Sequence, residues 1–140
     1  EAVINDEIKE LGKEACQKYW DNYPGCRQTR MMLPKTNSRL WKQLSKQPRK
    51  TMNLITQLYT GHSILKRHLF LMNIEDDNVC EQCDEGVEET VEHFLCSCPA
   101  FARNRQIALG YISLNKTDLP NIRLGKFLKF IRSTKRFEVE

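Results

Sequence analysis

The sequence predicts a mainly α-helical fold, a small helical domain with one loop rich in cysteine and histidine. Apolar residues recur every three to four positions along most of the chain, and no segment shows the period of two that a half-buried strand requires. Four cysteines and one histidine stand within residues 80–98. At 140 residues and 40% apolar content the chain can bury one core, so we expect a single domain over residues 1–140.

The first expected helix covers roughly residues 6–21. Its apolar positions are Ile4, Ile8, Leu11, Ala15 and Tyr19. Cys16 falls beside them, so we expect a buried free thiol there. After this helix, two prolines, a glycine and small polar residues predict a loop over residues 23–38, YPGCRQTRMMLPKTNS.

Two helices are expected in the middle of the chain and a third before the cysteines. A short one around residues 39–45 would place Leu40, Trp41 and Leu44 on one side. Pro48 can open the second in its first turn, where its missing N–H is no loss, and Thr60-Gly61 would end it. Ser63 is a suitable N-cap for a third helix over residues 64–72.

The segment after the cysteines predicts two more helices. Residues 99–109 form the first, which Gly110 would end, and Asp118 with Pro120 would start the last one, running through Ile131. By composition we divide the chain into an N-terminal helix (1–25), a basic helical segment (26–74), the cysteine-rich loop with its following helix (75–110) and a C-terminal helix (111–140).

Charge is arranged in blocks along the chain, although the net charge is only +4. Residues 22–74 carry ten Lys and Arg and no acid, whereas residues 75–98 carry nine Asp and Glu and no base. Residues 103–136 are basic again. Blocks of one sign create a patterned field that attracts a polyanion such as nucleic acid to the basic parts. A solvated helix face rich in Lys and Arg is the alternative interpretation.

The cysteine-rich loop has the spacing of a metal site. Cys80 and Cys83 are followed by His93 and Cys98, giving Cys-x2-Cys-x9-His-x4-Cys. Three thiolates and one imidazole are a closed tetrahedral set for Zn²⁺, with no position left for a reacting water. The sequence therefore predicts a structural zinc site in a zinc-knuckle-like loop. Thr90 is placed to cap a short helix over residues 91–95 that would fix the direction of the imidazole.

The fourth ligand has an alternative, because Cys96 lies one helical turn after His93. We favour Cys98, since the His-x4-Cys spacing is typical of zinc knuckles and Pro99 restricts the backbone before it. Disulfides and redox chemistry are further alternatives for the six cysteines. No secretory signal is visible, and a redox Cys-x-x-Cys normally sits in a strand-and-helix fold. The six are Cys16, Cys26, Cys80, Cys83, Cys96 and Cys98.

The first basic block supplies a predicted nucleic-acid-binding set. Its cations would neutralise phosphates and release counterions, with little reading of bases. Trp41 can stack a base or belong to the core. His62 and His68 are interpreted as packing residues, with extra metal ligation or phosphate contact as the alternative. The predicted set is Arg27, Arg30, Lys35, Arg39, Trp41, Lys42, Lys46, Arg49 and Lys50.

Several short motifs follow one another along the chain. They are Tyr59-Thr60-Gly61-His62, Cys80-x2-Cys83, Glu89-Thr90-x2-His93-Phe94-Leu95 and Cys98-Pro99-Ala100-Phe101, with Trp20, Cys26-Arg27-Gln28-Thr29-Arg30 and Trp41 before them. With these motifs, residues 58–101 resemble the region downstream of the ribonuclease H domain in insect-type non-LTR retrotransposon reverse transcriptase polyproteins. The resemblance covers most of residues 15–110. It implies a zinc-binding tail of such a polyprotein, with the metal on Cys80, Cys83, His93 and Cys98, and residues 1–25 as the end of a preceding ribonuclease H domain.

We expect a non-catalytic accessory module that binds the backbone of RNA or DNA. Reverse transcription and ribonuclease H chemistry need carboxylates gathered around metal ions, and the acids here lie on the first helix or flank the cysteines. The alternative is a protein-interaction adaptor whose acidic zinc loop docks onto another domain of the polyprotein. With no apolar run of eighteen residues, we expect no membrane partner and an intracellular location, nuclear or cytoplasmic. Because the chain starts at Glu1, we expect part of a longer protein.

Overall fold

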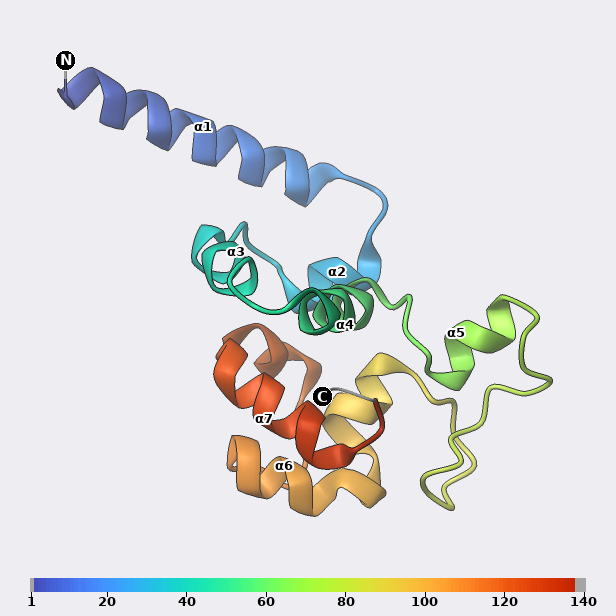
Figure 1. Ribbon diagram of the computed structural model, residues 1–140. Coiled ribbons are helices and arrows are strands. Elements are labelled where there is room, and N and C mark those ends of the chain that lie inside the picture. The colour runs from blue at the N-terminus through green and yellow to red at the C-terminus, as the bar shows by residue number, and fades with distance from the viewer. Residues whose placement is uncertain (1, 138–140) are drawn as a thin grey trace.

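Seven α-helices make up most of residues 2–137, the part of the chain that the computed structural model describes (Figure 1). No strand is present among those residues, and one isolated antiparallel bridge joins Val79 to Glu88. The predicted mainly helical fold is confirmed. Within the described range, no helix combines the length with the apolar character needed to cross a bilayer.

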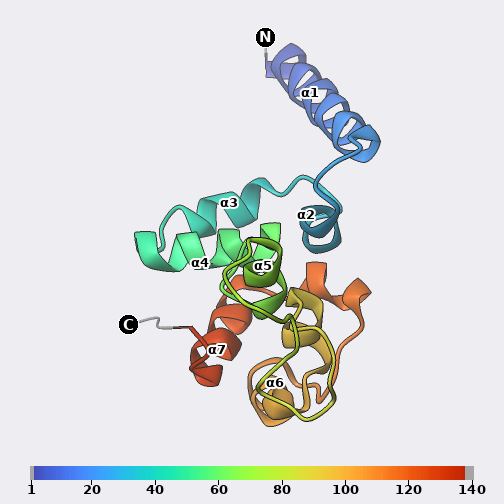
Figure 2. The same cartoon turned by 90° about the vertical axis from the view of Figure 1, so that its right-hand side faces the viewer.

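Helix α1 (Ala2–Asn22) projects from the rest of the molecule in both views (Figures 1 and 2). It buries none of its residues, and its apolar stripe, including Ile4 and Leu11, stays exposed. Cys16 is therefore also exposed, so the expected buried thiol was wrong. Only the last turns are held, where Trp20 Nε1 donates to the Leu33 carbonyl at 2.8 Å.

The predicted loop over residues 23–38 contains a helix, α2 (Arg27–Met32), so that prediction was wrong in part. The chain reverses at Cys26, which has the left-handed φ of 56°, and then winds into six helical residues. Met32 is 1% exposed and anchors this helix in the core. Six residues are too few for helical periodicity to stand out in a sequence, and the two prolines flank the helix without entering it.

Four helices enclose the core. In Figure 1, α3 (Ser38–Leu44) and α4 (Arg49–Thr60) lie above α7 (Leu124–Thr134), and α6 (Ala102–Leu109) lies below it. The α4 and α7 faces meet through Tyr59 and Phe127, whose ring centroids are 5.8 Å apart. Leu58 is fully buried on the same α4 face. The core therefore forms between α3 and α4, which belong to the basic residues 22–74, and α7, which belongs to the basic residues 103–136.

Helix ends follow the sequence signals in some places only. Gly61 and Gly110 end α4 and α6 with φ of 80° and 91°, values that glycine adopts without steric cost. Helix α5 (Lys66–Leu71), however, begins after Leu65, so the predicted cap at Ser63 was wrong. The last predicted helix is split into a 3₁₀ helix (Lys116–Asn121), which contains Pro120, and α7, because the backbone is extended at Ile122 and Arg123 between them.

Candidate metal centre

The first half of the cysteine-rich loop is a narrow hairpin-like turn. Cys80 N donates to the Val87 carbonyl at 2.8 Å, and Glu89 N donates to the Asn78 carbonyl at 2.9 Å. Gly86 turns the chain back with φ of 66°, as expected from its place between the two halves of the motif. These bonds hold the Cys80 and Cys83 side of the site.

The second half is a short helical segment whose last turn is unusually wide. Thr90 Oγ1 accepts the His93 N–H at 2.9 Å, which confirms the predicted cap. A π-helical turn follows over His93–Ser97, closed by the Cys98 N–H donating to the His93 carbonyl at 2.8 Å. An α-helical turn would bring the residue three or four positions later, such as Cys96, over the histidine. The five-residue turn brings Cys98 there instead.

The two halves bring together the side chains of Cys80, Cys83, His93 and Cys98, whose ligand atoms all lie within 4.8 Å of one another. Cys80 Sγ is 4.0 Å from Cys98 Sγ, and Cys83 Sγ is 3.4 Å from His93 Nε2. Around a tetrahedral ion with metal–ligand bonds of roughly 2.0–2.3 Å, such atoms stand about 3.5–3.8 Å apart. The four therefore form a group that can hold one metal ion.

Cys96 lies outside this group. It is 3% exposed, and its carbonyl accepts the Leu114 N–H at 3.0 Å. Burial raises the pKa of its thiol to about 11. All six cysteines are free thiols. Of the two predicted alternatives for the fourth ligand, the structure places Cys98 with the other three side chains.

Burial and backbone N–H groups act in opposite directions on the sulfurs. Burial raises the pKa of Cys98 to about 12 and raises that of Cys80 above its usual value. The backbone N–H groups of Gln82 and Cys83 point to the Cys80 sulfur, and that of Ala100 to the Cys98 sulfur, which favours thiolate. The thiols therefore keep their protons until a cation replaces them, and the N–H groups are then in place to stabilise the thiolates.

The imidazole is held in the form that a metal needs. Burial lowers the pKa of His93, so the ring is neutral near pH 7. Ser97 Oγ lies 3.3 Å from His93 Nδ1, which can donate to it while Nε2 faces the sulfurs. A metal-bound histidine normally has such a partner on its other nitrogen, because the hydrogen bond fixes the tautomer and the ring orientation.

These pKa directions predict a steep loss of metal affinity in acid. Burial raises the pKa of the Cys80 and Cys98 thiols above 9.0, so protonated thiols stabilise the folded, metal-free loop relative to the unfolded chain below about pH 9. This stabilisation is lost as the pH rises through about 12, the pKa of Cys98. Metal binding needs the opposite state, three thiolates. Affinity should fall by up to roughly a thousandfold per unit between about pH 8 and pH 6, one tenfold factor for each thiol proton. Competition with a chelator across this range measures it, and a pH-independent affinity would contradict the thiolate ligation.

Two contacts join the metal centre to the core. The ring of Phe94, the residue after His93, packs against Phe101, Phe130 and Phe137 with centroids 5.2–5.4 Å apart. The side chain of Arg105 on α6 is 1% exposed and donates to three backbone carbonyls, those of Phe94, Cys98 and Ile112. The site is therefore part of the main core, and the cysteine loop does not form a separate satellite.

Much of the acidity of the loop is neutralised inside the molecule. Glu89 is 2% exposed; its carboxylate accepts two hydrogen bonds from Arg136 at 2.9 Å and the Lys66 N–H at 2.8 Å. Lys66 Nζ pairs with Asp77 at 3.0 Å and with Glu81 at 2.6 Å. Arg67 pairs with Glu88 at 3.4 Å. Four of the nine acids are thus engaged by cations from α5 and the end of the chain.

The predicted nucleic-acid-binding residues come from three helices and the segments between them. Arg39, Trp41 and Lys42 lie exposed on α3, and Trp41 is 63% exposed, so its interpretation as a core residue was wrong. Arg30 is half-buried on α2 and donates to the Tyr23 carbonyl. Arg27 lines a small hollow that also includes Glu88, Glu89 and Glu92. The remaining four, Lys35, Lys46, Arg49 and Lys50, are exposed.

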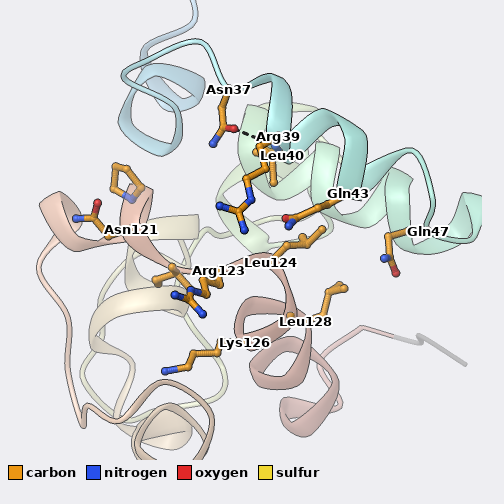
Figure 3. A pocket seen from close by; sticks show the side chains of 13 residues that line it. Asn37, Arg39, Leu40, Gln43, Gln47, Asn121, Arg123, Leu124, Lys126 and Leu128 are labelled. Atoms are coloured by element: carbon orange, nitrogen blue, oxygen red, sulfur yellow. Dashed lines mark hydrogen bonds between the residues drawn. The ribbon is translucent and has the colours of Figure 1, made fainter.

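The structure also shows cations that the predicted set omitted. Arg39 extends from α3 into a hollow whose opposite wall carries Arg123, just before α7, and Lys126 on α7 (Figure 3). The basic character of residues 103–136 was visible in the sequence, but nothing there indicated that α7 packs beside α3. The two other histidines, His62 and His68, form an edge-to-face contact with ring centroids 5.1 Å apart and are not in the metal group.

Comparisons of the chain with protein-family models, curated proteins and solved structures give no significant match.

Proposed function

We propose that the chain is a non-catalytic, zinc-stabilised nucleic-acid-binding module, an accessory part of a retrotransposon reverse transcriptase polyprotein. The observation that carries the proposal is the group of three sulfurs and one imidazole, within 4.8 Å of one another and with three of the four residues buried. The polyprotein assignment depends on the sequence resemblance over residues 58–101. The nucleic-acid role depends on the exposed cations.

Zinc is the metal that suits this group best. Three thiolates and one imidazole in a tetrahedral arrangement are a common structural zinc set, while oxygen-seeking ions such as Mg²⁺ and Ca²⁺ use carboxylates. The four ligands complete the coordination shell, so the ion would stabilise the loop and activate no water. Apparent binding free energies of about 10–16 kcal/mol for such sites can hold a loop that has few apolar residues of its own.

A backbone-binding role for the first basic block is supported by the distribution of ion pairs. Arg39, Lys42 and Lys46 are exposed and form no ion pair with a carboxylate in residues 2–137. Lys66 and Arg67, by contrast, are engaged with the acidic loop. Cations that the fold does not neutralise are available to phosphates, where they release condensed counterions.

Reversing these three charges should abolish retention of nucleic acid. The variant Arg39→Glu, Lys42→Glu, Lys46→Glu replaces three attractive contacts with repulsive ones, and wild-type affinity itself should fall steeply between low and physiological salt. Anisotropy titrations with a labelled RNA at several salt concentrations measure both effects. The matched control changes Lys9, Lys13 and Lys18 to Glu on the projecting helix α1, so the two variants have the same net charge. The control should bind RNA far more tightly than the first variant.

The rival function is a protein-interaction adaptor that docks through the acidic loop. The neutralisation of Asp77, Glu81, Glu88 and Glu89 by internal cations leaves less charge for such docking. The same charge-reversal variant separates the two functions. Docking through the acidic loop would survive reversal of Arg39, Lys42 and Lys46. The adaptor would be favoured if the wild-type chain binds no nucleic acid and the variant keeps full binding to a protein partner.

The proposal treats the chain as non-catalytic, because three thiols and one imidazole form a closed metal-binding set. Ribonuclease H chemistry instead uses carboxylates that hold two divalent ions. The acids of α1 lie on an exposed helix apart from the core. An RNA–DNA hybrid incubated with Mg²⁺ should remain uncleaved.

A further inference from the structure

We propose that two neighbouring hollows beside the start of α7 form a binding site for single-stranded nucleic acid, with Arg39, Arg123 and Lys126 holding phosphates and Tyr111 stacking a base. This inference deepens the proposed function and rests on it, because it places the strand at a site that includes one residue of the predicted set and three others. A single strand, rather than a duplex, is inferred from the concave shape and the exposed aromatic side chain.

The first hollow lies between α3 and α7 and has a volume of about 710 Å³ (Figure 3). Arg39 and Gln43 extend into it from α3, toward Leu124 and Arg123 on the other side. Its floor is apolar, since Leu124 and Leu128 are buried in the core below it. A concave site of this size, apolar beneath and polar at the sides, is suited to a planar ring with charged substituents.

The charge of the first hollow has one sign, whereas the second hollow also carries one acid, Asp118. The lining of the first hollow includes three cations and no acid. Arg39, Arg123 and Lys126 form no ion pair within residues 2–137. Amide side chains, including Gln43, also line the hollow and can donate to or accept from base edges. Unneutralised cations around a polar concavity match an anion that carries hydrogen-bonding groups, which a nucleotide does.

The second hollow extends the site toward an aromatic residue. It has a volume of about 580 Å³ and shares Arg123 and Lys126 with the first. Tyr111 lines it and is 61% exposed. Proteins that bind single strands combine a basic groove along the backbone with exposed aromatic rings on which bases stack. The shared cations are therefore placed to hold the phosphate between two nucleotides, one in each hollow.

The test uses anisotropy of a fluorescein-labelled oligouridine of about 15 nucleotides, with the zinc-loaded full chain. Removal of two phosphate contacts by Arg123→Ala with Lys126→Ala should weaken binding roughly 25-fold at about 0.1 M salt. It should also make the negative slope of log K against log salt shallower by about 1.4. Tyr111→Ala should weaken it about fivefold or more, whereas Tyr111→Phe should stay close to wild type. Zinc content and helical circular dichroism of each variant report folding.

The matched control is Lys129→Ala with Arg132→Ala, which removes two exposed cations of the same helix outside both hollows and should change affinity by about twofold at most. If the α7 pair does not fold, Arg39→Ala from the opposite wall should still weaken binding about fivefold. Equal losses in the two double variants, or tighter binding of a duplex of equal length, would overturn this site and leave the proposed function standing. A wild-type chain that binds neither strand nor duplex would overturn both.

Discussion

Replacing Cys98 with serine should abolish tight zinc binding and unfold the cysteine-rich loop. Cys98 is fully buried, 4.0 Å from the Cys80 sulfur, and a serine hydroxyl is a poor replacement for a thiolate ligand. Loss of a group that only hydrogen-bonds to a metal ligand already lowers metal affinity by about 10–100-fold. Loss of a ligand itself should therefore lower it by more than about 100-fold. Chelator competition measures the affinity, and loss of far-UV and near-UV circular dichroism reports the unfolding.

Cys96→Ala is the matched control for that experiment. Its thiol is equally buried and two residues away, but it lies outside the metal group. Truncation removes one sulfur from the core and should lower the free energy of unfolding by about 1 kcal/mol, with zinc affinity close to wild type. The opposite result, tight zinc in the Cys98→Ser chain and weak zinc in the Cys96→Ala chain, would show that the five-residue turn does not select the fourth ligand.

Arg105→Met should produce the second large effect, a loss of about 3–5 kcal/mol in the free energy of unfolding. The guanidinium is 1% exposed and donates to the carbonyls of Phe94, Cys98 and Ile112. Methionine keeps much of the apolar stem but leaves three carbonyls without this donor, and each buried group left unsatisfied costs about 1–3 kcal/mol. The melting temperature of the zinc-loaded chain should fall by roughly 10–15 °C.

Arg103→Met, on the exposed side of the same helix, is the control and should melt within a few degrees of wild type. Zinc affinity gives a second readout, because Arg105 holds the backbone at Cys98. Zinc affinity should fall by about 10–100-fold, as expected for a side chain that hydrogen-bonds to a metal-ligand residue. Unchanged melting in the Arg105→Met chain would contradict the inference that this side chain joins the metal centre to the core.

Most of the longer helices and the metal group were predictable from the sequence because their signals are local, whereas the six-residue helix α2 was not. Helical periodicity, the glycines at positions 61 and 110 and the Cys-x2-Cys spacing each act within a few residues. The sequence favours Cys98 as the fourth ligand but does not exclude Cys96, for a physical reason. An α-helical turn after His93 favours one and the wider turn the other, and the hydrogen bond from Cys98 N to the His93 carbonyl decides it.

Features that depend on distant contacts were not predictable. Cys16 and Trp41 are exposed because no neighbouring element covers their sides of α1 and α3. Helical periodicity identifies an apolar side of a helix but does not show whether another element packs on it. The same holds for Arg123 and Lys126, whose approach to Arg39 depends on α7 lying beside α3. Pairing of the buried Glu89 with Arg136 joins residues 47 positions apart, so the loop's acids looked more available in the sequence than they are in the fold.

Zinc-edge X-ray absorption of the chain purified under reducing conditions tests the central claim most directly. One zinc ion per chain is expected, with three sulfurs at about 2.3 Å and one nitrogen at about 2.0–2.1 Å. Cys80, Cys83 and Cys98 supply the sulfurs and His93 the nitrogen. A chain that folds to the same helical content with no bound metal, or a spectrum showing an oxygen-rich shell, would contradict a structural zinc ion at the centre of this fold.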